Sequence, residues 1–348
     1  MTLRVLVAGP SSQSRGGIAS VMRIMQSTGW CDAELSEVVT HRDGGVATRA
    51  TAAVCGVGRG LWLLAHGRAD VLHVHLSWGG SALRKGLLLR AAARAGVPSV
   101  VHAHGSRFAP WFDGLSPLLQ RLVRRLLQAD LYLVLGADQI AQYRDRLRIA
   151  AIEVLPNPVR RPDSAHPAGE AKAVFLGRFG PRKGIYDLLT ALRQVPGLSL
   201  TAAGDGEVDE VRRRARGLDV QVRSWLEPAE RDELLRDSSV FVLPSYHEGL
   251  PMALLEAMAF GLVPVVAPVG GIPDLVVDGE NGLLVAPGDV DALAGALRRL
   301  RDDPALLRRL GAAARASTEP LAATAWAHRL ELTWRSLSPP AQPVAASR

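Results

Sequence analysis

The chain has 348 residues, enough for two domains of ordinary size. A hydrophobic fraction of 48% allows sizeable cores, and 22% charged residues argues against a disordered chain. The net charge of +7 is uneven: residues 1–160 carry 19 Lys and Arg against 10 Asp and Glu, whereas residues 161–348 carry 22 against 24.

The basic first half predicts an anionic partner, for which acidic lipid headgroups, a lipid-pyrophosphate acceptor and an anionic glycan are the options. A solvated basic surface without a ligand is the simpler alternative. Nucleic acid is not expected, because no recognisable binding module accompanies the charge.

The cysteine content and the apolar runs indicate the compartment. Cys31 and Cys55 have neither metal-ligand nor disulfide spacing. The first residues enter a strand pattern without the apolar stretch of a secretion signal, and no run approaches the roughly 20 apolar residues of a membrane span. We expect a cytoplasmic protein, with peripheral attachment at the inner face of the membrane as a further option.

Strand and helix patterns alternate along the chain, which predicts an α/β protein with parallel sheets covered by helices. In the first half, strands are expected at 4–8, 34–39, 71–75, 99–104 and 131–135, and helices near 17–28, 47–66, 80–95, 116–128 and 138–147. In the second half, strands are expected at 173–177, 198–203, 220–225, 240–243, 263–267 and 283–285.

A stretch rich in Pro and polar residues, without periodicity, separates the two halves. Near the end of the chain Trp326, Leu330 and Trp334 recur every four residues, which predicts a helix with one apolar stripe that can pack on either domain. The expected boundaries are an N-terminal domain 1–157, a linker 158–170, a C-terminal domain 171–320, a C-terminal helix 321–337 that can cross back to the N-terminal domain, and a disordered tail 338–348.

The segment 240–289 carries the most specific pattern. An apolar strand ends at Pro244, a loop carries Glu248, and a helix expected to start at Pro251 carries Glu256, eight residues after the first acid. Free amides at a helix start bind anions or hydroxyl groups, and two fixed carboxylates beside them suit a polyhydroxylated ligand. From spacing alone, an ordinary crossover with two unrelated acids is equally acceptable.

These acids, with AMAFG at 257–261, PVV at 264–266, GG at 270–271 and NGLLV at 281–285, resemble the family 4 retaining glycosyltransferases, whose signature is this E-x7-E pair. The resemblance implies the GT-B fold: two Rossmann-like domains facing each other across a cleft, the first on the acceptor side and the second binding a nucleotide sugar. The match covers most of the second half, and the first half matches more loosely.

Arg178 lies just past an expected strand end, and Lys183 lies beside an expected helix start. This is the crevice where open α/β sheets bind ligands, and cations there stabilise a departing diphosphate. The resemblance implies that both residues grip the two phosphates, with Arg182 able to substitute in part. No Asp-x-Asp motif follows a strand; Asp289 and Asp291 begin a helix, where capping explains them, so no catalytic metal is expected.

In the second domain, the resemblance implies that Glu256 binds the ribose hydroxyls and that Glu248 holds the hexose together with backbone amides. Pro251 has no amide to offer. By the resemblance, these amides belong to Gly249, Leu250 and Met252. The resemblance also places Gly204 and Leu226 near the base of the donor.

In the first domain, small residues after the first strand let backbone amides approach a ligand. The loop is not G-x-G-x-x-G, so a nicotinamide cofactor is not expected. The resemblance matches Gly16 and Gly17 to a pair that contacts donor phosphate or acceptor. It matches His104 to the active-site His that holds a donor-sugar hydroxyl and the acceptor.

Three further histidines, His73, His75 and His102, accompany His104 at two strand ends. Alternation places His73 and His75 on one face of their strand. Because no Cys or Glu nearby completes a shell, a zinc site is not expected.

A stretch over 118–128 alternates apolar and basic faces at helical spacing, and Trp111 and Phe112 precede it, as in an interfacial helix. Docking of this helix on an anionic membrane is one interpretation, and a helix that simply covers the sheet is the other.

The sequence thus predicts a retaining, metal-independent hexosyltransferase without a cofactor, using a UDP- or GDP-linked sugar and a glycan or lipid-linked acceptor, in bacterial surface polysaccharide or glycolipid synthesis. By the resemblance, transfer proceeds by front-face substitution. Two alternatives remain: a sugar-nucleotide epimerase of the same architecture, and a catalytically silent nucleotide-sugar-binding partner protein.

Overall fold

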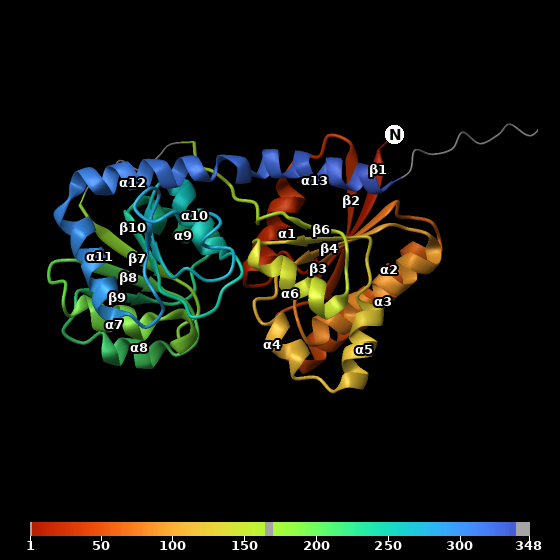
Figure 1. Ribbon diagram of the computed structural model, residues 1–348, viewed down its shortest axis with the longest axis horizontal. Helices are drawn as coiled ribbons and strands as arrows, with labels where there is room; N and C mark the ends of the chain where they lie inside the picture. The colour runs from red at the N-terminus through yellow and green to blue at the C-terminus, as the bar shows by residue number, and fades with distance from the viewer. Residues whose placement is uncertain (1, 164–169, 339–348) are drawn as a thin grey trace, which may run out of the picture. The chain divides into compact units, whose positions relative to one another are not determined.

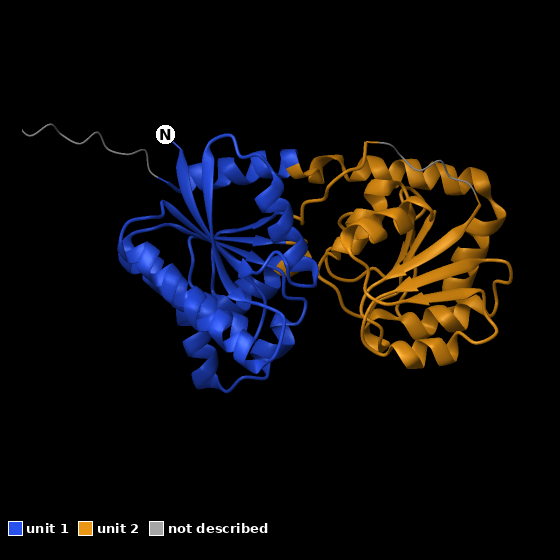
Figure 2. Ribbon diagram, turned by 180° about the vertical axis from the view of Figure 1, so that it is seen from behind, with its two compact units in different colours: residues 1–134, 140–155, 324–348 blue, residues 135–139, 156–323 orange. Residues whose placement is uncertain are grey.

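The computed structural model describes residues 2–163 and 170–338, which form two compact units (Figure 1, Figure 2). Unit 1 contains Met1–Val134, Ile140–Leu155 and Thr324–Arg348, and unit 2 contains Leu135–Gln139 and Pro156–Ala323. Part of the expected linker (164–169) and most of the expected tail (339–348) lie outside the described residues.

Unit 1 is built on a six-stranded, wholly parallel sheet with the order β2-β1-β3-β4-β5-β6. The central strands are almost fully buried, as expected when helices cover both faces of a parallel sheet. The strands are β1 Leu3–Pro10, β2 Ala33–His41, β3 Val71–Leu76, β4 Ser99–Ala103, β5 Leu131–Val134 and β6 Ile152–Val154.

The two faces of this sheet differ in character. Leu72 and Val74 join an aliphatic core with Leu64 and Leu88 from two helices, whereas His73 and His75 point to the opposite face, as the alternation predicts. The helices of unit 1 are α1 Gly17–Ser27, α2 Val46–Ala65, α3 Gly80–Ala95, α4 Phe108–Asp113, α5 Pro117–Leu126, α6 Asp138–Leu147 and α13 Ala323–Leu337.

The last helix, α13, packs on the histidine face of the unit 1 sheet. The Trp334 indole donates to His73 Nδ1 at 3.1 Å, and Glu331 accepts from the Asp32 amide at 3.0 Å. Conversely, Leu135–Gln139 belongs to unit 2, where the Ala137 amide donates to Asp274 at 2.6 Å. The units therefore interchange short segments, and their limits differ from the expected division at residue 157.

Unit 2 repeats the plan with a parallel sheet of order β12-β11-β10-β7-β8-β9. Its strands are β7 Lys172–Leu176, β8 Ser199–Ala203, β9 Val220–Arg223, β10 Val240–Leu243, β11 Val263–Val266 and β12 Leu283–Leu284. Its helices are α7 Ile185–Leu192, α8 Val208–Arg214, α9 Pro228–Arg236, α10 Met252–Phe260, α11 Val290–Asp302 and α12 Pro304–Ser317, with single 3₁₀ turns η1 Pro181–Lys183 and η2 Glu319–Leu321.

Two expected boundaries need correction. The helix after β10 starts at Met252, and Pro251 precedes it as the N-cap residue with an extended backbone (φ −66°, ψ 129°). Strand β9 ends at Arg223, so Leu226 lies in the loop that leads to α9.

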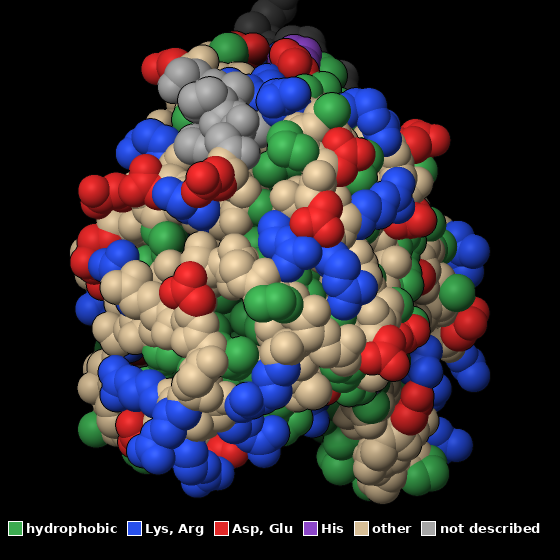
Figure 3. Space-filling model, turned by 90° about the vertical axis from the view of Figure 1, so that its left-hand side faces the viewer, with side chains coloured by type: hydrophobic (Ala, Val, Ile, Leu, Met, Phe, Trp, Pro, Cys, Tyr) green, Lys and Arg blue, Asp and Glu red, His purple; other side chains and the backbone are tan. Residues whose placement is uncertain are grey.

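The surface chemistry of one face is visible in Figure 3, which shows basic and acidic side chains interspersed. Interspersed charges of both signs are ordinary for a solvated surface. Among the described residues, no helix combines the length and the apolar character needed to span a bilayer.

Candidate active site

The strand order of unit 2 locates its ligand-binding edge. Strand β7 has β8 on one side and β10 on the other, so the chain direction across the sheet reverses between β7 and β10. Open α/β sheets bind ligands at the carboxyl ends of the strands beside such a reversal. The loops that leave β7 and β10 carry Arg178, Lys183 and Glu248, and Glu256 follows in α10.

Glycines bring these loops into close contact. At Gly184, between η1 and α7, φ is +70° and a Cβ atom would lie 2.1 Å from the Pro244 carbonyl oxygen. Any other residue at this position would therefore push the β7 and β10 loops apart. Gly204, after β8, is confined in the same way, because a Cβ atom there would lie 1.8 Å from the Gly177 carbonyl oxygen.

Lys183 and Glu248 form an ion pair between the two loops. Their side chains are 15% and 8% exposed, so the contact is largely shielded from water. Shielding strengthens the attraction between opposite charges, but it also makes either charge costly without its partner. The pair fixes a cation and a carboxylate at this edge of the sheet.

Arg178 lies in the loop that leaves β7 and is exposed. Within the described part of the chain its guanidinium forms no hydrogen bond or ion pair, which leaves its five donors open to a ligand. Arg182 is engaged instead: its guanidinium donates to the His247 carbonyl at 3.0 Å, and its own carbonyl accepts from the Tyr246 amide. Arg182 therefore positions the β10 loop.

The start of α10 offers unbonded amides. No side chain caps this helix, and among the described residues the amides of Gly249, Leu250 and Met252 have no hydrogen-bond partner. The Leu250 carbonyl accepts from Asn157 at 2.9 Å, which fixes the loop. An uncapped helix start with convergent amides binds anionic or hydroxyl oxygens.

Glu256 is held by an arginine that the sequence patterns did not single out. The Arg231 guanidinium, on α9, donates to Glu256 Oε1 at 2.9 Å and to Asp232 Oδ1 at 2.8 Å. Burial lowers the pKa of Arg231, but the charges of Glu256 and Asp232 outweigh it and leave that pKa raised. Arg231 lies outside every recognised motif, so nothing in the sequence marked it. Leu226, in the loop before α9, is half-buried.

Unit 1 has an equivalent reversal between β1 and β3. Gly16, which precedes α1, has φ 111° and ψ 168°, and Gly17 begins the helix. Helix α1 has no side-chain cap, and the space beside Gly16 is open, because a Cβ atom there would meet no atom within 4 Å. This loop thus has the same properties as the start of α10: small residues and an uncapped helix.

His104 follows β4, and its amide donates to the Leu76 carbonyl at the end of β3. Its Nε2 lies 2.8 Å from His75 Nδ1; its ring stacks on His75 with centroids 5.1 Å apart and is tilted against His102 with centroids 4.3 Å apart. The hydrogen bond fixes the ring orientation. His104 is half-buried, whereas His73, His75 and His102 are fully buried.

Burial keeps the inner histidines neutral. It lowers the pKa of His102 to about 4 and the pKa of His73 and His75 well below the ordinary value. Ligand atoms of these three residues lie within 4.8 Å of one another. Both His75 nitrogens already have partners, His104 and Met25, and His102 Nε2 lies 3.1 Å from the Leu155 carbonyl. Among the described residues, His73 Nε2 and His102 Nδ1 are buried without a hydrogen-bond partner, so the cluster beside His104 is only partly hydrogen-bonded.

The expected cap at the start of α11 is present: Asp289 Oδ1 accepts from the Ala292 amide at 2.9 Å. Asp291 accepts from Gln194 at 2.9 Å. These contacts account for both acids structurally.

Solved structures share this architecture. Sucrose-phosphate synthase from Thermosynechococcus elongatus superposes with a TM-score of 0.75 at 20% identity, covering 96% of this chain and 99% of that one. HepE of Anabaena in complex with UDP-glucose superposes with a TM-score of 0.75 at 18% identity, covering 96% and 100%. Two Rossmann-like units of this kind define the GT-B fold class.

Residues 157–317 match the family described as glycosyl transferases group 1, and residues 25–158 match the glycosyl transferase 4-like domain. The chain belongs to the family 4 glycosyltransferases. Glycogen synthase of Mycobacterium tuberculosis is 30% identical over 277 residues, which span 71% of this chain and 64% of that enzyme. Phosphatidyl-myo-inositol mannosyltransferase of Mycolicibacterium smegmatis is 28% identical over 270 residues, spanning 73% and 67%.

Proposed function

We propose that this protein is a retaining, metal-independent hexosyltransferase that moves a hexose from a UDP-sugar to a glycan or lipid-linked acceptor. The observation that carries the proposal is the shielded Lys183–Glu248 pair beside the unbonded amides of α10. UDP is favoured over GDP because HepE, of the same fold, was solved with UDP-glucose. Relatives named as a glycogen synthase, a phosphatidyl-myo-inositol mannosyltransferase and a lipopolysaccharide core biosynthesis glycosyltransferase support a glycan or lipid-linked acceptor.

Arg178 and Lys183 neutralise the charge that builds on the departing diphosphate. The Lys183 ammonium has three donors, so it can keep its contact with Glu248 and still reach a phosphate oxygen. Lys183, fixed in a shielded site by its contact with Glu248, stabilises a developing charge without reorganising, so the proposed reaction needs no metal. Glu248 and the amides of Gly249 and Met252 then orient the hexose.

Glu256, held by Arg231, binds the ribose hydroxyls, and Leu226 and Gly204 border the base. On the acceptor side, Gly16 and Gly17 approach phosphate or acceptor through their backbone, and His104 holds a sugar hydroxyl and the acceptor. These roles follow the family resemblance.

In the transfer step the bond from the sugar C1 to the β-phosphate oxygen breaks. The acceptor oxygen forms its bond to C1 on the face that the phosphate leaves. The acceptor proton passes to the departing phosphate oxygen, so UDP leaves with one proton more.

The test measures UDP-sugar binding and turnover in a Lys183→Met variant. Thermal shift against UDP-, GDP-, ADP- and TDP-sugars first identifies the donor, since a ligand of the folded state stabilises it according to its affinity. We expect UDP-sugars to stabilise the wild type most, and Lys183→Met to lower kcat/KM for donor turnover at least a hundredfold, in line with the loss of an oxyanion donor.

Lys172→Met is the matched control. Lys172 is an exposed lysine at the start of β7, whereas Lys183 follows the end of that strand. Unchanged turnover in a folded Lys183→Met protein would contradict the assigned site. Conversion of the donor to an epimer without acceptor would instead indicate an epimerase.

A further inference from the structure

A pocket on unit 1 is lined only by glycine and apolar residues. Its volume is about 230 Å³, and it lies between α3, α4 and α5. A cavity of about 150 Å³ lined by apolar side chains stays dry and accepts benzene, so this pocket has room for a larger apolar group. The residues that shape it include Ala82, Leu83, Trp111, Leu119, Leu122 and Leu126.

The rim of the pocket is an exposed apolar surface. Helix α5 buries none of its residues, and Leu118, Leu119 and Leu122 are 75%, 46% and 48% exposed. Leu83 and Leu87 on the neighbouring α3 are also exposed. Contiguous apolar surface of this kind marks an interaction site.

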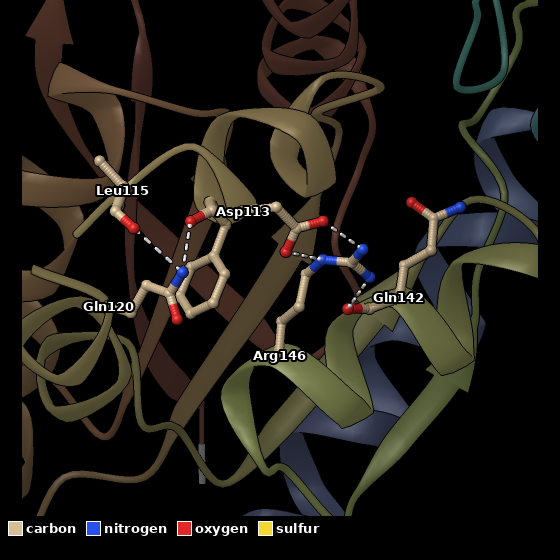
Figure 4. Close-up of polar contacts among 6 residues, drawn as sticks. Asp113, Leu115, Gln120, Gln142 and Arg146 are labelled. Carbon is tan, nitrogen blue, oxygen red and sulfur yellow. Dashed lines mark hydrogen bonds and ion pairs between the residues drawn. The ribbon is translucent and has the colours of Figure 1, made fainter. Parts of the chain in front are cut away.

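Side-chain contacts fix the turn between α4 and α5 (Figure 4). Gln120 donates to the carbonyls of Leu115 and Phe112 at 3.1 and 3.3 Å, which fixes the turn between α4 and α5. The Arg146 guanidinium contacts both carboxylate oxygens of Asp113 at the end of α4, at 2.9 and 2.6 Å. These contacts fix the turn between α4 and α5, which carries Leu115 of the pocket lining.

The surrounding chain is strongly basic. Residues 44–129 contain eleven Lys and Arg and only two acids, Asp70 and Asp113. Both acids are paired with arginines outside this segment: Asp70 with Arg4 and Asp113 with Arg146, each at 2.6 Å. No acid within residues 44–129 is therefore left to neutralise the exposed arginines of α5. A basic surface of this kind suits an anionic partner.

An apolar pocket surrounded by basic residues fits an anionic lipid better than it fits the surface of a protein. The pocket can hold one hydrocarbon chain, and the arginines can bind a phosphate group. The pocket begins at Gly79, three residues after β3 ends at Leu76. The Leu76 carbonyl also binds the His104 amide. The Gly79 end of the pocket thus lies near the carboxyl edge of the unit 1 sheet, where His104 also lies.

We propose that α3 and α5 dock unit 1 on an anionic lipid bilayer, with one lipid hydrocarbon chain in the pocket and Arg121 and Arg125 against lipid phosphates. Docking in this way brings the acceptor side of the enzyme to a membrane. This role of the docking rests on the proposed function. Lipid binding itself requires neither donor nor acceptor.

The test is co-sedimentation of the full chain with vesicles of phosphatidylcholine alone or mixed with phosphatidylglycerol. We expect at least tenfold stronger binding to the mixed vesicles, weakened by salt because exposed charges are screened. The double variant Leu119→Gln/Leu122→Gln should lose at least tenfold in affinity. Leu332→Gln, which removes an exposed leucine of α13, should bind as the wild type does.

Ala82→Leu tests the pocket itself, because the added side chain fills it without changing surface charge. We expect this variant to bind the fluorescent single-chain fatty acid cis-parinaric acid at least fivefold more weakly than the wild type. Equal binding to neutral and anionic vesicles, unchanged affinity in both variants, or self-association through this surface without vesicle binding would overturn the proposal.

UDP-sugar binding, followed by thermal shift, should be unaltered in the α3 and α5 variants. Loss of vesicle binding with donor binding intact would therefore count against the docking alone. A wild type that binds vesicles but no nucleotide sugar would count against the transferase.

Discussion

The contact between Arg231 and Glu256 shows how one residue outside the signature motif controls another inside it. Glu256 is 13% exposed, so its carboxylate needs a partner in the absence of ligand. Arg231 supplies that partner and sets the direction of the second carboxylate oxygen.

We predict that Arg231→Met raises KM for the UDP-sugar about tenfold, which corresponds to about 1.4 kcal/mol of lost binding, and changes kcat less. The reason is that Glu256, to which we assign the ribose hydroxyls, then loses its fixed orientation, whereas Arg178 and Lys183, to which we assign the phosphates, are untouched. Steady-state kinetics measure the split, and UDP binding by calorimetry should weaken in parallel.

Arg236→Met is the control on the same helix, because Arg236 is exposed and contacts the Phe260 ring at 5.7 Å rather than an acid. In Arg231→Lys we expect KM for the UDP-sugar to recover in part, since lysine keeps the positive charge but lacks the planar guanidinium group. A fall in kcat with unchanged KM would refute the positioning role.

At the scale of single residues the sequence predicted where the candidate site residues lie along the chain, but not the contacts between them. The positions of Arg178, Lys183 and Glu248 after strand ends followed from apolar runs and loop residues. The direct pairing of Lys183 with Glu248 did not, because it depends on close loop packing at Gly184. Arg231 was missed because long-range contacts leave no local pattern.

Among the elements, α13 shows most clearly what a pattern leaves undecided. The stripe of Trp326, Leu330 and Trp334 predicted an apolar helix face, but an apolar face suits either sheet equally well. The structure packs α13 in unit 1, where Trp334 lies against Trp30 with ring centroids 5.0 Å apart and donates to His73. The polar contacts of Glu331 and Arg335 with Asp32 and its amide determine the partner.

We predict that Trp334→Leu destabilises unit 1 by about 3 kcal/mol, because it leaves a cavity and an unbonded His73 nitrogen. Urea unfolding followed by circular dichroism measures this loss. Trp62→Leu provides the comparison, since Trp62 is 53% exposed on α2, and its replacement should cost well under 1 kcal/mol. Equal losses in the two variants would mean that α13 does not stabilise unit 1.

Over the whole molecule, the alternation of strands and helices predicted two parallel α/β sheets, which the structure confirms. The strand order could not be read from that alternation, because it depends on which strands pair across each sheet. The clustering of four histidines in one face of unit 1 likewise arises from the parallel pairing of β3 with β4, which sets His75 opposite His102.

This buried cluster makes a prediction about pH. In the unfolded chain a histidine takes up a proton near pH 6.5, whereas in the folded protein the pKa of His102 is about 4. Between these values the unfolded state binds more protons, so the free energy of unfolding falls as the pH falls. For His102 alone the loss across this window is about 3 kcal/mol, and buried His73 and His75 act in the same direction.

Urea unfolding at several pH values between 6.5 and 4 measures this dependence. His102→Gln should reduce the slope by about one proton, because the residue that titrates differently in the two states is gone. His66→Gln, at an exposed position on the C-terminal cap of α2, should leave the slope unchanged. If the free energy of unfolding changed with pH equally in the wild type and in His102→Gln, the buried histidines would accept protons without unfolding. The neutral state inferred for these imidazoles would then be wrong.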